Sequence, residues 1–123
     1  MSTSLVSVQT VTIAAASSIS SSINLNGMVN APNGLRLFGI VMPSEWTDAN
    51  ITFQVSVDGG TTWNNLYNSS GSEVQVVADS SRAIIIEPDA FASITYIKIR
   101  SGTSGTAVNQ AAARTIKLLL RSY

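Results

Sequence analysis

The feature that most constrains the fold is a run of strict alternation that ends in a turn. Residues 51–57 alternate apolar and polar side chains without interruption: Ile51, Thr52, Phe53, Gln54, Val55, Ser56 and Val57. Successive side chains of a strand point to opposite faces of its sheet, so this period of two predicts a half-buried strand. The turn-forming residues Asp58-Gly59-Gly60-Thr61 follow directly, and a second strand-like run occupies residues 62–67. The stretch as a whole predicts a β-hairpin.

Other short strand-like runs recur along the chain, with turn signals between them. We expect these strands at residues 5–13, 20–25, 35–42, 73–77, 82–87, 94–100 and 114–121. Dipeptides that favour turns, such as Asn26-Gly27 and Asn33-Gly34, separate some of them. The sequence shows no long amphipathic helical pattern. About eight or nine short strands with regular turn signals predict an all-β fold, an antiparallel β-sandwich, of which the jelly roll is one form.

The length of the chain fits one domain over residues 1–123. A tract of small residues at 14–22 is rich in Ser and Ala. Its Ala content allows a helix, but its Ser residues and β-type neighbours favour a loop or an extended segment. Within residues 1–34 the sequence therefore leaves two expectations open, short strands of the sandwich or an extended N-terminal arm.

Charge and composition exclude several classes of function. Seven basic and seven acidic side chains cancel, and only 11% of the residues are charged. A neutral chain has no long-range attraction for nucleic acid or anionic membrane, so we expect neither as a partner. The sequence contains no Cys and no His, which excludes disulfides, thiolate metal sites and Ser–His triads. Low charge with many Ser, Thr and Asn residues suits a protein that belongs to an assembly or an outer surface.

The carboxylates give no pattern of a catalytic or metal site. They are Glu45, Asp48, Asp58, Glu73, Asp79, Glu87 and Asp89. A glycosidase needs two carboxylates facing each other across a pocket, and a calcium site needs a dense cluster of oxygen ligands. Most of these residues lie at predicted turns, where capping of backbone amides explains them. We therefore expect no enzymatic activity, no catalytic residue, no cofactor and no metal site.

The hairpin carries a recognisable motif. Residues 56–63 match the pattern Ser-x-Asp-x-Gly-x-Thr-Trp at Ser56, Asp58, Gly60, Thr62 and Trp63. The motif resembles the Asp-box, a hairpin element of sialidase-like propellers and of several unrelated β proteins. We expect Asp58 to accept hydrogen bonds from turn amides, Gly60 to adopt a backbone shape unfavourable for other residues, and Trp63 to pack under the hairpin. Propellers carry several copies and this chain carries one, so we interpret the motif as a structural staple.

Two sets of residues are candidates for a partner interface. The first is an apolar outer face predicted for residues 35–42, where Leu35, Leu37 and Val41 are assigned inward. The outward residues of this strand are then Phe38, Ile40 and Met42, together with Arg36. A strand that is apolar on both faces is covered twice or contacts another subunit. The second set is a basic row at Tyr96, Lys98 and Arg100, with Lys117 and Arg121 expected on a neighbouring strand; it either contacts an acidic partner or is a solvated sheet face.

Several segments together resemble small virion proteins of tailed bacteriophages. They are residues 45–67, Phe91, residues 96–103, residues 108–114 and the terminal apolar strand, about the last two-thirds of the chain. The resemblance implies a compact β fold that binds the capsid shell or lies near the head–tail junction, and it supplies no catalytic residues. It also implies a major capsid protein or other virion subunits as partners, and a homo-oligomer, of which a trimer is one form.

The resulting hypothesis is a non-enzymatic capsid decoration or cement protein, located at the capsid surface of the virion. No apolar run approaches the length of a membrane span, and residues 1–5 lack the basic start of a signal peptide. We therefore expect synthesis in a host cytoplasm. The alternatives are a carbohydrate-binding or receptor-binding module, which needs Trp46 or Tyr96 exposed, and a head–tail adaptor or collar component.

Overall fold

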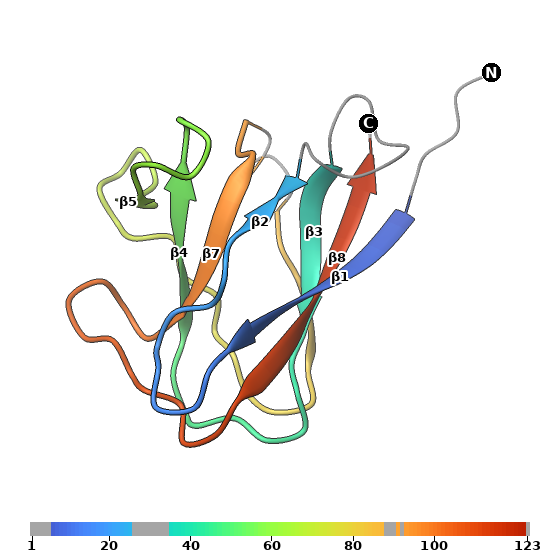
Figure 1. The fold of residues 1–123 in the computed structure, drawn as a ribbon, viewed down its shortest axis with the longest axis vertical. Helices are drawn as coiled ribbons and strands as arrows, with labels where there is room; N and C mark the ends of the chain where they lie inside the picture. Colours follow the sequence, from blue (N-terminus) through green and yellow to red (C-terminus); the bar gives the residue numbers. More distant parts are fainter. Residues whose placement is uncertain (1–5, 26–34, 88–90, 92, 123) are drawn as a thin grey trace.

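The computed structural model describes residues 6–25, 35–87, 91 and 93–122, and they form two sheets (Figure 1). The strands are β1 (Val6–Ile13), β2 (Ile23–Asn24), β3 (Leu35–Val41), β4 (Ile51–Ser56), β5 (Asn64–Asn65), β6 (Ala83–Ile85), β7 (Tyr96–Ser101) and β8 (Arg114–Ser122). The two sheets have four antiparallel strands each, which confirms the predicted β-sandwich. In the described part of the chain no helix has the length and apolar character to cross a membrane.

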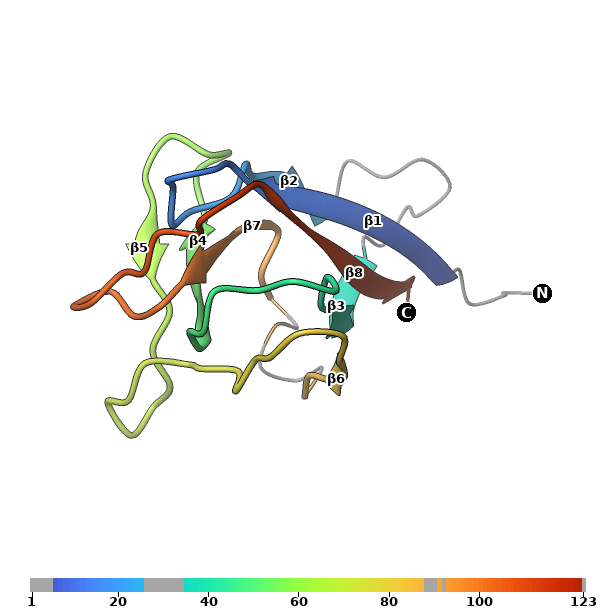
Figure 2. The ribbon, with the colours of Figure 1, turned by 90° about the horizontal axis from the view of Figure 1, so that it is seen from below.

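The strand order identifies the sandwich as a jelly roll. One sheet has the order β1-β8-β3-β6 and the other the order β2-β7-β4-β5. First pairs with last, second with seventh, third with sixth and fourth with fifth, which is the pattern of one long antiparallel ribbon rolled over itself. In Figure 2 the two sheets form separate layers, and β6 lies at the end of its layer opposite β1.

The core lies between the two sheets and is built from alternate residues of their strands. Fully buried side chains come from both layers, among them Phe53, Ile97, Ile99, Ile116, Leu118 and Leu120. Phe53 contacts Phe91 edge to face, with ring centroids 5.0 Å apart. The alternation in residues 51–56, 94–100 and 114–121 therefore predicts which apolar side chains face the core. The prediction of a half-buried strand is wrong for β4, because Thr52 and Ser56 on its other face are also buried, and Val57, which follows β4, is 85% exposed.

A β-bulge in β3 overturns the prediction for that strand. Leu37 pairs with Leu120 and Gly39 pairs with Leu119, so β3 carries one extra residue between them. The extra residue reverses the alternation, and Ile40 and Met42 are buried in the core instead of lying on an outer face. Only Phe38 of the predicted apolar outer face remains partly exposed. Gly39 is required here, because a Cβ atom would lie 2.8 Å from the carbonyl oxygen of Ile84.

The N-terminal part of the described chain belongs to the sandwich. β1 pairs with β8 over eight residues, and Ile19 and Ser20 form bridges to Arg100 and Ile13. The expectation of an extended arm is therefore wrong for residues 6–25, while residues 1–5 and the turns predicted at 26–34 lie outside the described residues. The strand expected at residues 73–77 contributes only two isolated bridges, Glu73 to Tyr67 and Val76 to Ile51.

Candidate functional site

The Asp-box residues form a hydrogen-bonded turn at the end of β4. The Thr62 amide and the Ser56 hydroxyl both donate to Asp58 Oδ1 at 2.8 Å. The Gly60 amide donates to Ser56 Oγ at 2.8 Å, and Gly60 has a φ of +94°, a conformation that L side chains rarely adopt. These contacts are those expected from the sequence for Asp58 and Gly60. The carboxylate acts here as an acceptor within its own hairpin.

The same contacts lower the pKa of the hairpin carboxyl. The backbone amide of Thr62, followed by the Ser56 hydroxyl, lowers the pKa of Asp58 from 3.8 to about 2. Hydrogen bonds from these donors stabilise the ionised carboxylate more than the protonated carboxyl, and this lowers the pKa. The shift is therefore explained by the turn itself and needs no ligand or partner.

Trp63 is also held by its own chain. Its Nε1 donates to the Gly60 carbonyl oxygen at 3.0 Å, and Lys98 Nζ lies 4.4 Å from the ring centroid. Tyr96, on the same sheet face, accepts a hydrogen bond from Asn24 Nδ2 at 3.0 Å. A cation over an aromatic ring is a favourable contact that occupies the ring face a sugar would stack on. Trp46, the other proposed sugar contact, is buried and donates to the Ala49 carbonyl oxygen.

Arg100 lies on the outer side of β7, as predicted, but the chain covers it. Its guanidinium contacts Glu73 Oε2 at 3.2 Å and donates to Asn65 Oδ1, and the Arg100 and Glu73 side chains are only 7% and 8% exposed. Residues 65–73 therefore close over this end of the sheet. Arg100 does not reach the surface, and its assignment to an exposed partner interface is wrong.

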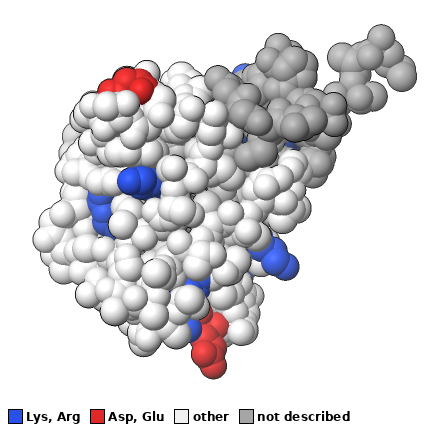
Figure 3. Space-filling view, in the orientation of Figure 1, with Lys and Arg blue, Asp and Glu red and all other residues white. Residues whose placement is uncertain are grey.

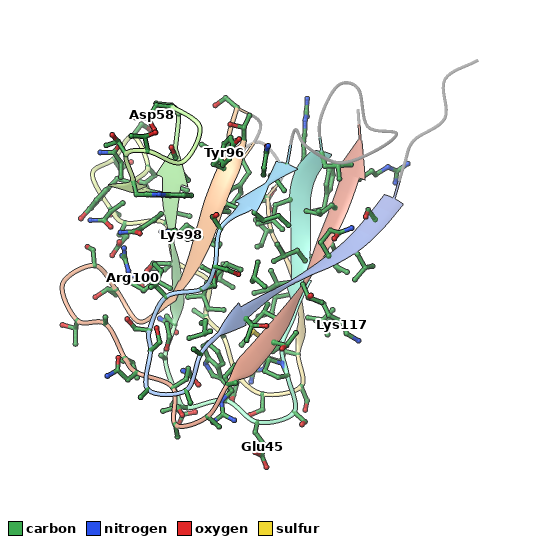
Figure 4. The ribbon with its side chains drawn as sticks, viewed as in Figure 1. Glu45, Asp58, Tyr96, Lys98, Arg100 and Lys117 are labelled. Carbon is green, nitrogen blue, oxygen red and sulfur yellow. The ribbon has the colours of Figure 1, made fainter. Side chains whose placement is uncertain are left out.

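The predicted basic row is divided between the two sheets. β7 pairs with β2 and β4, whereas Lys117 and Arg121 belong to β8, which pairs with β1 and β3. Figure 4 shows Lys98 and Arg100 on one side of the molecule and Lys117 on the other. In Figure 3 the basic side chains form separate patches rather than one row. Lys117 and Arg121 are therefore not neighbours of Tyr96 and Lys98.

The structure instead aligns apolar side chains across the outer face of the β1-β8-β3-β6 sheet. Val8 pairs with Leu119, Leu119 with Gly39, and Gly39 with Ile85, so this register forms one row over all four strands. Val8 and Ile85 are 54% and 88% exposed. Leu37 and Ile40 point into the core, which leaves the bulge residue Phe38 beside Gly39 on the outer side. We call Val8, Leu119, Phe38 and Ile85 the outer stripe.

An apolar groove continues the outer stripe around the edge of the sheet. Within the described residues β6 pairs with β3 alone, and no described strand pairs with its other edge. Next to this edge lies a groove of about 650 Å³, and its apolar lining includes Val74, Val76, Val77, Ile84, Ile85 and Phe91. Val77 is also largely exposed. Ile85 belongs to both features, so the outer stripe and the edge groove form one continuous apolar surface.

This surface could not be predicted from the sequence. Each of its strands was predicted, but the row depends on the register of four strands that are distant in sequence. The bulge at Phe38 decides which β3 residues face outward, and one inserted position has no signal in the hydrophobic pattern. The consecutive residues Ile84, Ile85 and Ile86 give one hint, because alternate side chains of a strand point to opposite faces and such a run places apolar side chains on both.

Comparisons of the chain with protein-family models, curated proteins and solved structures gave no match. Within the described residues, no three His, Cys, Asp or Glu side chains come together as a metal-binding group. The candidate functional site is therefore the outer stripe with its edge groove.

Proposed function

We propose that the chain is a non-enzymatic structural protein of a phage virion, a capsid decoration or cement protein, that docks on the head shell through the outer stripe. The observation that carries the proposal is the alignment of Val8, Leu119, Phe38 and Ile85 in one band across a whole sheet. Single exposed apolar residues are normal on a protein surface, but a contiguous apolar band is typical of a protein contact. The resemblance to small virion proteins supplies the shell as the partner.

The free energy gained by burying the outer stripe is suitable for this role. Burial of apolar area contributes about 25 cal/mol per Å² before the costs of association, so a patch of a few hundred Å² contributes several kcal/mol. One such contact is weak to moderate for a protein pair. If homotrimers present three stripes to the shell at once, their combined binding is much tighter than one contact. A decoration protein gains its effect on the shell from many repeated contacts of this kind.

The structure gives different support to the two alternative functions. The structure offers few aromatic rings for a carbohydrate-binding module, because Trp46 is buried in the core and Lys98 covers one face of Trp63. A head–tail adaptor would use the same apolar surface, and it differs from a decoration protein only in its place on the particle. Screening on a glycan array with a Tyr96→Ala control tests the first alternative, and saturable binding that Tyr96→Ala removes would favour it.

Cosedimentation with purified shells tests the proposed function. The informative pair of variants is Ile85→Asp and Val57→Asp, because both side chains are almost fully exposed, at 88% and 85%. Ile85 lies on the outer stripe, whereas Val57 lies at the hairpin after β4. We expect Ile85→Asp to weaken shell binding at least tenfold and Val57→Asp to leave it unchanged. The proposal fails if the wild-type protein does not bind shells, or if both variants bind like the wild type.

A further inference from the structure

We propose that the outer stripe docks on an acidic protein surface, one that presents an apolar ridge with carboxylates on both sides, and not on a second copy of this chain. This inference rests on the proposed function, since it names the chemistry of the partner at the same surface. Its basis is the distribution of charge around the stripe.

The sheet that carries the outer stripe is basic. The sequences of β1, β3, β6 and β8 contain no Asp and no Glu, but they contain four of the seven Lys and Arg residues of the chain: Arg36, Arg114, Lys117 and Arg121. The acidic residues of the chain lie in the segments between strands, and two of them, Glu73 and Glu87, line the edge groove. Within the strands of this sheet, the charged side chains are all positive.

Two of these cations flank the outer stripe directly. Lys117 and Arg121 lie two residues before and two residues after Leu119 on β8, so all three side chains share the outer face. Four residues of strand place their Cα atoms about 13 Å apart. Arg36 pairs in register with Arg121 and adds a third cation at that end. The stripe therefore has positive charge on both of its long sides.

Lys117 and Arg121 differ from the other cations in their contacts. Arg82, Arg100 and Arg114 each pair with a carboxylate, and Lys98 lies over the Trp63 ring. Among the residues that the structure describes, Lys117 and Arg121 take part in no ion pair and no cation–π contact. Both are exposed. A partner with carboxylates at matching positions would complete these two contacts.

The same charges argue against the other occupants of the surface. A twofold contact between copies would bring identical patches together and set one basic rim against another. Nucleic acid binding depends on many phosphate contacts, and here two exposed cations flank an apolar centre. The apolar row and the two cations together fit a protein surface that is complementary in both respects. If the protein forms a trimer, its subunit contacts lie away from the outer stripe.

Shell binding at several salt concentrations tests this inference, with charge-reversal variants of the purified protein. The test variants are Lys117→Glu, Arg121→Glu and the pair combined; the matched control is Lys98→Glu, the same change on the other sheet. We expect each single test variant to weaken binding about tenfold and the double variant about a hundredfold at 50 mM salt. Lys98→Glu should stay within about twofold, and the conservative double variant Lys117→Arg with Arg121→Lys should bind like the wild type. Wild-type affinity should fall steadily as salt is raised, because ions screen the rim contacts.

Each other outcome decides against the inference. If Ile85→Asp no longer binds shells but the double charge-reversal variant still does, the proposed function is retained. The inference of an acidic partner is then wrong. A wild-type protein that does not bind shells would overturn both the proposed function and the acidic partner. Binding of the wild type to duplex DNA or to phosphatidylserine vesicles, if the double variant loses it, would then identify a different class of partner. Sedimentation equilibrium covers the remaining occupant: a wild-type oligomer that Ile85→Asp dissociates would show that a second copy occupies the stripe.

Discussion

The outer faces of the two sheets differ in where their polar and apolar groups find partners. On the β2-β7-β4-β5 sheet the chain supplies them: Arg100 pairs with Glu73, Lys98 lies over Trp63, and Asn24 donates to Tyr96. On the β1-β8-β3-β6 sheet the outer stripe lies open between Lys117 and Arg121. The charged and aromatic groups named on the first face therefore have partners within the chain. On the second face the apolar side chains and the two cations are available to another molecule. The difference predicts that mutations on the first face affect stability and mutations on the second affect binding.

The largest expected effect comes from Arg100→Ala. The change leaves Glu73, which is 8% exposed, as a buried charge without its partner, and breaking such a pair typically costs about 3–5 kcal/mol. Urea denaturation measures the loss. The control is Arg82→Ala, whose ion pair with Asp79 is 55% and 49% exposed and should contribute at most about 0.5 kcal/mol. Equal losses in the two variants would remove the distinction between a covered face and an ordinary surface.

A smaller loss is expected from Trp63→Ala. The substitution removes a half-buried ring, its hydrogen bond to the Gly60 carbonyl oxygen and its contact with Lys98, and we expect about 2 kcal/mol of destabilisation. Trp63→Phe should recover part of it. Shell binding by the folded variant should be unchanged. A stable variant that no longer binds would show that the motif contacts a partner instead of stapling the hairpin.

The Asp58 carboxylate gives the hairpin a dependence on pH. Because folding lowers its pKa from 3.8 to about 2, the folded state binds fewer protons than the unfolded state between those values. The stabilisation by Asp58 is present above pH 4 and is lost as the pH falls towards 2. Thermal unfolding of the wild type and of Asp58→Asn should therefore differ at pH 5 and converge by pH 2. A constant difference over this range would mean that the turn contacts do not favour the ionised carboxylate.

The smallest effect on stability is expected on the open face. Ile85→Ser replaces a side chain that is 88% exposed, so the free energy of unfolding should change by no more than about 0.5 kcal/mol. Thermal denaturation checks this value. A loss of several kcal/mol would mean that Ile85 is part of the core, and the outer stripe would then be a feature of folding and not a docking surface.

The sequence predicts the fold better than it predicts the surface. Alternation in residues 51–57, 94–100 and 114–121 is a local signal, and the structure buries most of the apolar side chains that it assigns to the core, although Val57 is 85% exposed. The Asp-box contacts are equally local, since Ser56, Asp58 and Thr62 lie within one turn. The outer stripe joins residues that are up to 111 positions apart in the chain, from Val8 to Leu119, and only strand register brings them together. The burial of Ile40 and Met42 depends on the bulge in β3, for which Gly39 inside the strand was the one local signal. The burial of Arg100 depends on a covering loop, which has no local pattern.

An electron cryo-microscopy map of the particle would show which sheet of the jelly roll contacts the shell. We expect the outer face of β1-β8-β3-β6 to lie against another protein, with Ile85 buried and with acidic side chains of that protein near Lys117 and Arg121. The face that carries Trp63, Tyr96 and Lys98 should then point to solvent. A map with the β2-β7-β4-β5 face against the shell and the outer stripe exposed would show that the outer stripe is not the docking surface.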